Sequence, residues 1–286
     1  MYWTMFRNQL WIENQKNLKP NLLWIEIVLL GVFVLFIFAG LYIAIQGTPD
    51  SVTITDADLG KIPQLITWPG ALAFSLRFAA GSKLLLIIFV GAVTASEYTW
   101  RTYHLWLSRG IPRTLLLVSK FISLCLPILL VVTGALVAGG LISAIFSLYI
   151  NGSLYLEQVI FWRLGLDIFR TTYTLLPYVG ITFFLAVATR SAVAAIGGCA
   201  GFGLIVESLL GQTLLLMPGK IGEAAKYLPV NLMQSLLNAS WTPPALIEET
   251  MPGLLAPSPA TIGIAIWTLV SFGLALWFFR RQDFSG

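Results

Sequence analysis

Residues 22–45 read LLWIEIVLLGVFVLFIFAGLYIAI, an almost uninterrupted apolar run. A helix needs about 20 mainly apolar residues to cross the hydrocarbon core of a bilayer. Other segments meet or approach that length, at 68–95, 114–146, 166–189, 192–210 and 260–279. Hydrophobic residues make up 57% of the chain and charged residues only 10%, which is far too apolar for a soluble domain of this size. The sequence therefore predicts an all-α, multi-pass membrane protein with six transmembrane helices in one domain, residues 1–286.

The basic residues around these segments predict an orientation. With the N-terminus inside, only four basic residues fall on the outer side, namely Lys61, Arg163, Lys220 and Lys226. The inner side collects Arg7, Lys16, Lys19, Arg101, Arg109, Arg113, Arg190, Arg280 and Arg281. Because cytoplasmic flanks carry the excess of lysine and arginine, we expect both termini in the cytoplasm and the chain in the cell membrane. The net charge of +4 follows from this bias, and no nucleic-acid partner is expected.

Three further segments carry local signals: the N-terminus, the third apolar segment and the proline-rich segment before the last span. Trp3, Phe6 and Leu10 recur at helical spacing, which predicts a cytoplasmic interfacial helix over residues 1–21; a frayed polar tail is the alternative. Pro127 lies inside the segment 114–146 and predicts a kinked or tilted helix. Residues 211–259 are rich in proline and too long for a simple turn, so we expect a long extracytoplasmic loop there, with one short helix in its middle, over 223–237.

The polar, aromatic stretch at residues 96–112 separates the second and third segments. A helix from Glu97 to Arg109 would place Trp100, Tyr103 and Leu107 on one side. Gly110 and Pro112 would end it and turn the chain into the next span. Its apolar groups suit a helix held between the membrane and a second protein; an ordinary amphipathic connector on the lipid surface is the alternative.

The same stretch resembles a known family. Glu97, Trp100-Arg101-Thr102, Leu107-Ser108-Arg109-Gly110, Pro112-Arg113 and Lys120 are similar to the motif of the membrane (permease) subunit of type 2 ABC exporters. Arg101 stands where that family usually has glycine. The resemblance implies that residues 96–112 form a coupling helix that docks on a separate ATPase, with Glu97 orienting its N-terminal end. The docking residues it implies are Glu97, Trp100, Arg101, Thr102, Tyr103, Leu107 and Arg109.

The resemblance also implies the partners. The chain has no G-x-x-x-x-G-K-[ST] phosphate loop, so ATP and Mg would be bound by two copies of a partner ATPase and no cofactor by this chain. A second permease chain, identical or different, would complete the transporter in the lipid bilayer. The function implied is the outward movement of a hydrophobic or amphipathic solute, peptide or lipid by alternating access.

Ionisable groups inside the apolar segments are the other candidate site. Such groups are costly in lipid and normally face protein or water, so we expect them to point into the bundle. They line a translocation path or outer gate, or they are ion pairs that fix the helices, as the one-turn spacing of Asp167 and Arg170 suggests. Lys83 has no partner nearby in the sequence. The set is Arg77, Lys83, Asp167, Arg170, Thr174 and Glu207.

Two other functional classes compete with the exporter. An ion-coupled secondary transporter would use Lys83, Asp167, Arg170 and Glu207, although no internal repeat supports it. A membrane scaffold or integral enzyme is the third interpretation. His104 is the only histidine and has no second ligand at metal-binding spacing, and Cys125 and Cys199 lie in apolar segments where a thiol acts as a small hydrophobe. The sequence predicts no catalytic residue and no metal site.

Overall fold

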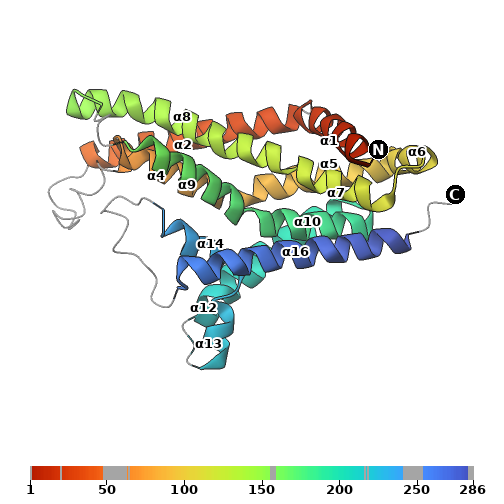
Figure 1. Cartoon of the computed structure of the whole chain (residues 1–286). Helices are drawn as coiled ribbons and strands as arrows, with labels where there is room; N and C mark the ends of the chain where they lie inside the picture. The colour runs from red at the N-terminus through yellow and green to blue at the C-terminus, as the bar shows by residue number, and fades with distance from the viewer. Residues whose placement is uncertain are drawn as a thin grey trace.

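A long bundle of helices makes up the computed structural model of the chain (Figure 1). The structure describes residues 2–19, 21–47, 63, 65–154, 159–215, 217, 219–240 and 254–282. No strand occurs among these residues. Two parts of the expected outer loops, 48–62 and 241–253, lie outside the described residues.

The helices follow the apolar segments of the sequence. The first half of the chain forms α1 (Tyr2–Leu18), α2 (Asn21–Gly47), α4 (Gly70–Gly81), α5 (Lys83–Thr99), α6 (Thr102–Ser108), α7 (Arg113–Ser123) and α8 (Cys125–Asn151). The second half forms α9 (Phe161–Thr174), α10 (Leu176–Thr189), α11 (Ala192–Gly201), the π-helix η2 (Phe202–Gly211), α12 (Gln212–Leu215), α13 (Lys220–Ala225), α14 (Pro229–Leu237) and α16 (Pro257–Arg281). The predicted all-α class is confirmed.

Five helical stretches of the described chain are long and apolar enough to cross a membrane. A sixth is reached if α4 and α5, which meet at a bend of 46°, count as one span. The chain is therefore a multi-pass helical membrane protein. Large apolar side chains face outward along these helices, as lipid contact requires; Phe36 of α2, for example, is 71% exposed.

Two of the apolar segments are divided near a proline. The chain passes from α7 to α8 at Leu124, just before Pro127, and from α9 to α10 at Leu175, just before Pro177. Proline has no backbone N–H, and its ring conflicts with the carbonyl four residues earlier, so the helix is interrupted in the preceding turn. A helix break therefore lies near Pro127, while the kink or tilt predicted there stays a prediction.

The core of the bundle lies around α10, which packs against α16, α11 and α5. Gly139 of α8 lies directly against the Ser75 hydroxyl of α4, where a larger residue would not fit. Small residues let membrane helices approach closely, and α4 and α8 use this device. α2 packs along α8 at the edge of the bundle.

The bundle has two distinct ends (Figure 1). The start of α1, the short helix α6 and the C-terminal end of α16 lie at one end. The starts of α4 and α9 and the end of α8 lie at the other. In its described part the segment 211–259 contains the short helices α12, α13 and α14, and α14 falls within the short helix predicted over 223–237.

The N-terminal helix is confirmed, but its inward face is polar. Gln9, Glu13 and Asn17 are buried, whereas Trp3 is 76% and Trp11 is 64% exposed. Residues four apart lie on one side of a helix, so the polar side of α1 packs onto α7 and the aromatic residues point away from the protein. A surface helix of a soluble protein has the opposite arrangement.

Candidate functional site

The connection between α5 and α7 is broken rather than one continuous helix. α5 ends at Thr99, and Arg101 adopts a left-handed conformation with φ of 53° that turns the chain into α6. The single helix predicted from Glu97 to Arg109 is therefore wrong in its first part. Gly110, with φ of 77°, and Pro112 end the connection as predicted.

The exposed side of α6 differs from the predicted docking face. Trp100 is 78% and Leu105 is 57% exposed, and Arg101 and Arg109 are exposed beside them. Thr102 and Leu107 are half-buried. We call the four exposed residues the α6 tip: Trp100, Arg101, Leu105 and Arg109.

Tyr103 was predicted on the same surface, and this assignment is wrong. Its ring is only 2% exposed and meets Tyr98 and Phe279 edge to face, at centroid distances of 4.7 Å and 5.1 Å. A helix of seven residues that lies on the bundle must turn one face to the core. The large aromatic ring of Tyr103 lies on that face and is buried. Burial raises the pKa of its hydroxyl well above the ordinary value.

Beneath α6, two carboxylates and two ammonium groups form a four-charge cluster: Glu13, Lys16, Glu97 and Lys120. Lys120 Nζ lies 2.9 Å from Glu97 Oε1 and 3.3 Å from Glu13 Oε2. Lys16 Nζ lies 3.2 Å from both Glu13 Oε1 and Glu97 Oε1. Since these residues belong to α1, α5 and α7, the cluster joins three helices, of which α1 lies far from the other two in the sequence.

Glu97 was expected to orient the N-terminal end of the coupling helix. It lies in the last turn of α5, before α6, and is 7% exposed. The Thr102 hydroxyl donates a hydrogen bond to Glu97 Oε2 and so ties the first residue of α6 to the four-charge cluster. Burial disfavours the charge of Lys16, but Glu13 and Glu97 outweigh that effect and raise its pKa above the usual value.

The partners Glu13 and Lys16 were missed from the sequence. Their three-residue spacing, together with the polar series Gln9, Glu13 and Asn17 at intervals of four, was the signal for a buried polar face. The Asn17 amide confirms this face by donating to Ser123 Oγ of α7 at 2.8 Å.

Lys83, Tyr178 and Glu207 form a second buried site within the bundle. Lys83 Nζ lies 2.6 Å from Glu207 Oε2, and the Tyr178 hydroxyl donates to the same oxygen at 2.7 Å. The Val230 N–H donates to Glu207 Oε1 at 3.1 Å. Glu207 lies in the π-helix η2, a type of element that often occurs at functional sites. Lys83 therefore has a partner, although it lies 124 residues away in the chain.

The remaining predicted polar groups are bonded to other groups of the protein. Arg170 Nη1 lies 3.4 Å from Asp167 Oδ1 and also donates to the Ala239 carbonyl at 3.0 Å. Arg77 donates to Asn238 Oδ1 at 3.0 Å. The hydroxyl of Thr174 donates to the Thr171 carbonyl of its own helix, so it is engaged with the backbone.

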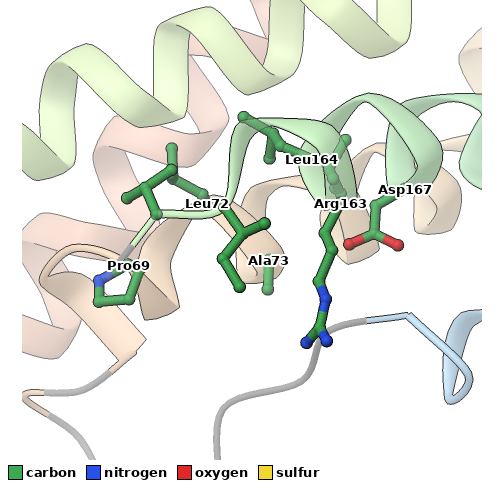
Figure 2. Close-up of a pocket in the computed structure, with 9 residues that line it drawn as sticks. Pro69, Leu72, Ala73, Arg163, Leu164 and Asp167 are labelled. Atoms are coloured by element: carbon green, nitrogen blue, oxygen red, sulfur yellow. The ribbon is translucent and has the colours of Figure 1, made fainter. Parts of the chain in front are cut away.

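A pocket lies between the first turns of α4 and α9 (Figure 2). Its walls are mainly apolar, with Arg163 and Asp167 both projecting from α9. A smaller pocket continues from it along Asp167 and adds Arg77 and Ser240. The lining of the first pocket is Pro69, Leu72, Ala73, Leu76, Val159, Ile160, Arg163, Leu164 and Asp167.

Glu26 of α2 is a buried carboxylate outside the predicted sites. It is 4% exposed, and neither of its oxygens has a hydrogen-bond partner among the described residues. Buried charged groups normally have partners, so this side chain is unusual.

Redox or metal chemistry has no visible site in the described chain. No group of three histidine, cysteine, aspartate or glutamate side chains there is arranged for a metal ion. Cys125 is half-buried, Cys199 is buried, and both are free thiols. His104 is half-buried on α6.

Comparison with known proteins gives a family. No curated protein matches the sequence. Residues 79–285, from the end of α4 through α16, match the family described as "Protein of unknown function (DUF2705)". Because this match covers more than half of the 286 residues, the chain belongs to the DUF2705 family.

Proposed function

We propose that the chain is the membrane-spanning permease subunit of an ATP-driven exporter that moves a hydrophobic or amphipathic solute, peptide or lipid outward. The observation that carries the proposal is the α6 tip, where Trp100 is 78% and Leu105 is 57% exposed at one end of the bundle. Exposed aromatic and arginine side chains are the groups that dominate protein interfaces. A separate ATPase is the partner that this surface would bind.

The anchoring of α6 supports a mechanical role. Glu97 connects the start of α6 to Lys120 on α7 and Lys16 on α1, and Tyr103 fixes the helix to Phe279 of α16. A movement of the partner against the α6 tip would therefore be passed to several helices at once. An interfacial connector would not need this buried ionic attachment, since lipid contact alone holds such helices.

The topology follows from the same proposal. The start of α1, α6 and the end of α16 share one end of the bundle, and the excess of basic residues assigns that end to the cytoplasm. With α4 and α5 as one bent span, six helices cross the cell membrane. Two such chains, identical or different, would assemble with two ATPase subunits that bind ATP and Mg.

The test is capture of the ATPase. Trp100→Ala should leave the permease folded in the membrane but weaken ATPase binding at least about thirtyfold, which corresponds to about 2 kcal/mol for an interface anchor. Trp162→Ala is the matched control, because Trp162 is similarly exposed, at 81%, but lies at the start of α9 at the other end of the bundle.

Copurification and transport in the host membrane would be measured for both variants. Reduced ATPase recovery with Trp100→Ala alone supports docking at the α6 tip. Full binding and transport by Trp100→Ala would refute it.

An ion-coupled secondary transporter is the second candidate. The favouring observation is the buried pair of Lys83 and Glu207, which could exchange a proton or cation during transport. In that mechanism Arg77, Asp167, Arg170 and Thr174 would line the path or outer gate beside them. Transport driven by an imposed ion gradient in vesicles that contain only this chain would favour the secondary transporter over the ATP-driven permease.

A further inference from the structure

Exposed apolar side chains border the pocket between α4 and α9. Ile160 lines the pocket and is 51% exposed, and the next two residues, Phe161 and Trp162, are 70% and 81% exposed. These three side chains begin α9, where a helix entering a bilayer carries its aromatic residues at headgroup depth. A molecule dissolved in the membrane can therefore reach the pocket without crossing water.

The guanidinium of Arg163 lies at the mouth of this pocket. Arg163 is exposed, and among the described residues its side chain makes no ion pair or hydrogen bond. Figure 2 shows its guanidinium extending away from α9, past the wall formed by Leu72 and Ala73. An arginine at headgroup depth binds phosphate oxygens through two parallel N–H bonds.

The inner part of the pocket has different chemistry. Leu72, Leu76 and Leu164 provide apolar walls, and Asp167 lies beyond them with its charge directed to Arg170 at 3.4 Å. A negative group would be repelled by Asp167 but attracted by Arg163. Charge therefore keeps an anionic head at the mouth, while the leucine walls accept an apolar chain.

We propose that this pocket binds one anionic phospholipid of the surrounding bilayer, with its phosphate at Arg163 and an acyl chain against Leu72, Leu76 and Leu164. The site is separate from the α6 tip, which lies at the other end of the bundle, and does not depend on the ATPase. The lipid fills the gap between α4 and α9 and holds the outer ends of these helices together.

The test uses the full chain in detergent without any ATPase. Phosphatidylglycerol and phosphatidylcholine are added separately, and bound lipid is measured by native mass spectrometry together with the thermal unfolding midpoint. We expect phosphatidylglycerol to bind more tightly than phosphatidylcholine and to raise the midpoint. Arg163→Gln should weaken phosphatidylglycerol binding about fivefold, the effect of one basic residue near an anionic lipid.

Three variants complete the design. Arg163→Lys keeps the charge and should retain most of the binding, whereas Lys220→Gln removes an exposed cation on α13 and should change nothing. Ala73→Leu keeps every charge but fills the pocket wall and should reduce binding of the acyl chain. Equal affinity for both lipids, equal binding by Arg163→Gln and Lys220→Gln, or the same protection by inorganic phosphate alone would overturn the proposal.

Discussion

The four-charge cluster and the Lys83–Glu207 site both hold buried charges, but the number of ionic partners of each charge differs. In the cluster, Lys16 and Lys120 each contact both Glu13 and Glu97, so every charge has two opposite charges beside it. Lys83 and Glu207 have only each other as ionic partners in the described chain. Buried charge is therefore shared among four groups where α6 is anchored, and paired one to one inside the bundle.

The one-to-one site should give the largest loss of stability. Lys83→Met leaves Glu207, which is fully buried, with the Tyr178 hydroxyl and the Val230 N–H as its only partners in the described part of the chain. Removing one member of a buried ion pair costs about 3–5 kcal/mol because the other charge stays buried. Unfolding of the purified chain by denaturant should report this loss.

The double variant Lys83→Met with Glu207→Gln provides the control. It removes both charges and should recover a large part of the lost stability. A single variant as stable as the unaltered chain, or a double variant whose loss equals or exceeds the sum of the losses of Lys83→Met and Glu207→Gln, would show that the two charges do not stabilise each other.

The four-charge cluster should lose less when one cation is removed. Lys120→Met leaves Lys16 in contact with both carboxylates, so we expect a cost of about 2 kcal/mol. Lys16→Met should cost about 1 kcal/mol or less, because the Lys16 side chain is 34% exposed and its ion pairs are screened by water. The two variants match in chemistry and differ in burial.

Denaturant unfolding of both variants measures the difference. Equal costs would mean that burial does not set the strength of these pairs. A cost for Lys120→Met as large as that for Lys83→Met would mean that the shared arrangement gives no protection.

The fold was largely predictable from the sequence because the length of an apolar run decides whether a helix crosses the bilayer. The end of the connection between α5 and α7 was also predictable from Gly110 and Pro112, because their backbone preferences are local. Helix class and helix ends depend on neighbours in the sequence, and such signals can be read directly.

The candidate sites were less predictable because they depend on contacts across the fold. Lys83 and Glu207 are 124 residues apart, and no local pattern connects them. The burial of Tyr103 was missed because a helical wheel shows which side chains share a face but not which face meets the bundle. The break at Arg101 was missed since arginine is an ordinary helix former.

Replacing Glu26 should change the stability of the chain in the opposite direction from replacing a paired carboxylate. Because neither oxygen of this buried side chain has a described partner, Glu26→Leu replaces a desolvated polar group by an apolar one and should stabilise the chain by about 1 kcal/mol. Glu97→Leu is the matched control and should destabilise, since Lys16 and Lys120 would lose a partner. Thermal unfolding midpoints that fall for both variants would contradict the distinction.

The smallest effect is expected at Arg101, beside the shared cluster. A residue with a side chain is strained at φ of 53°, whereas glycine adopts this conformation freely. Arg101→Gly relieves that strain but also makes the unfolded chain more flexible, so the net gain should be about 0.5 kcal/mol. Arg109→Gly is the matched control: Arg109 closes the same helix with an ordinary φ of −79°, so this variant has no strain to relieve and should lose stability through the more flexible unfolded chain. Denaturant midpoints of the isolated chain, measured without any ATPase, separate this backbone effect from docking; a loss of stability in Arg101→Gly equal to that in Arg109→Gly would mean that the left-handed turn carries no strain.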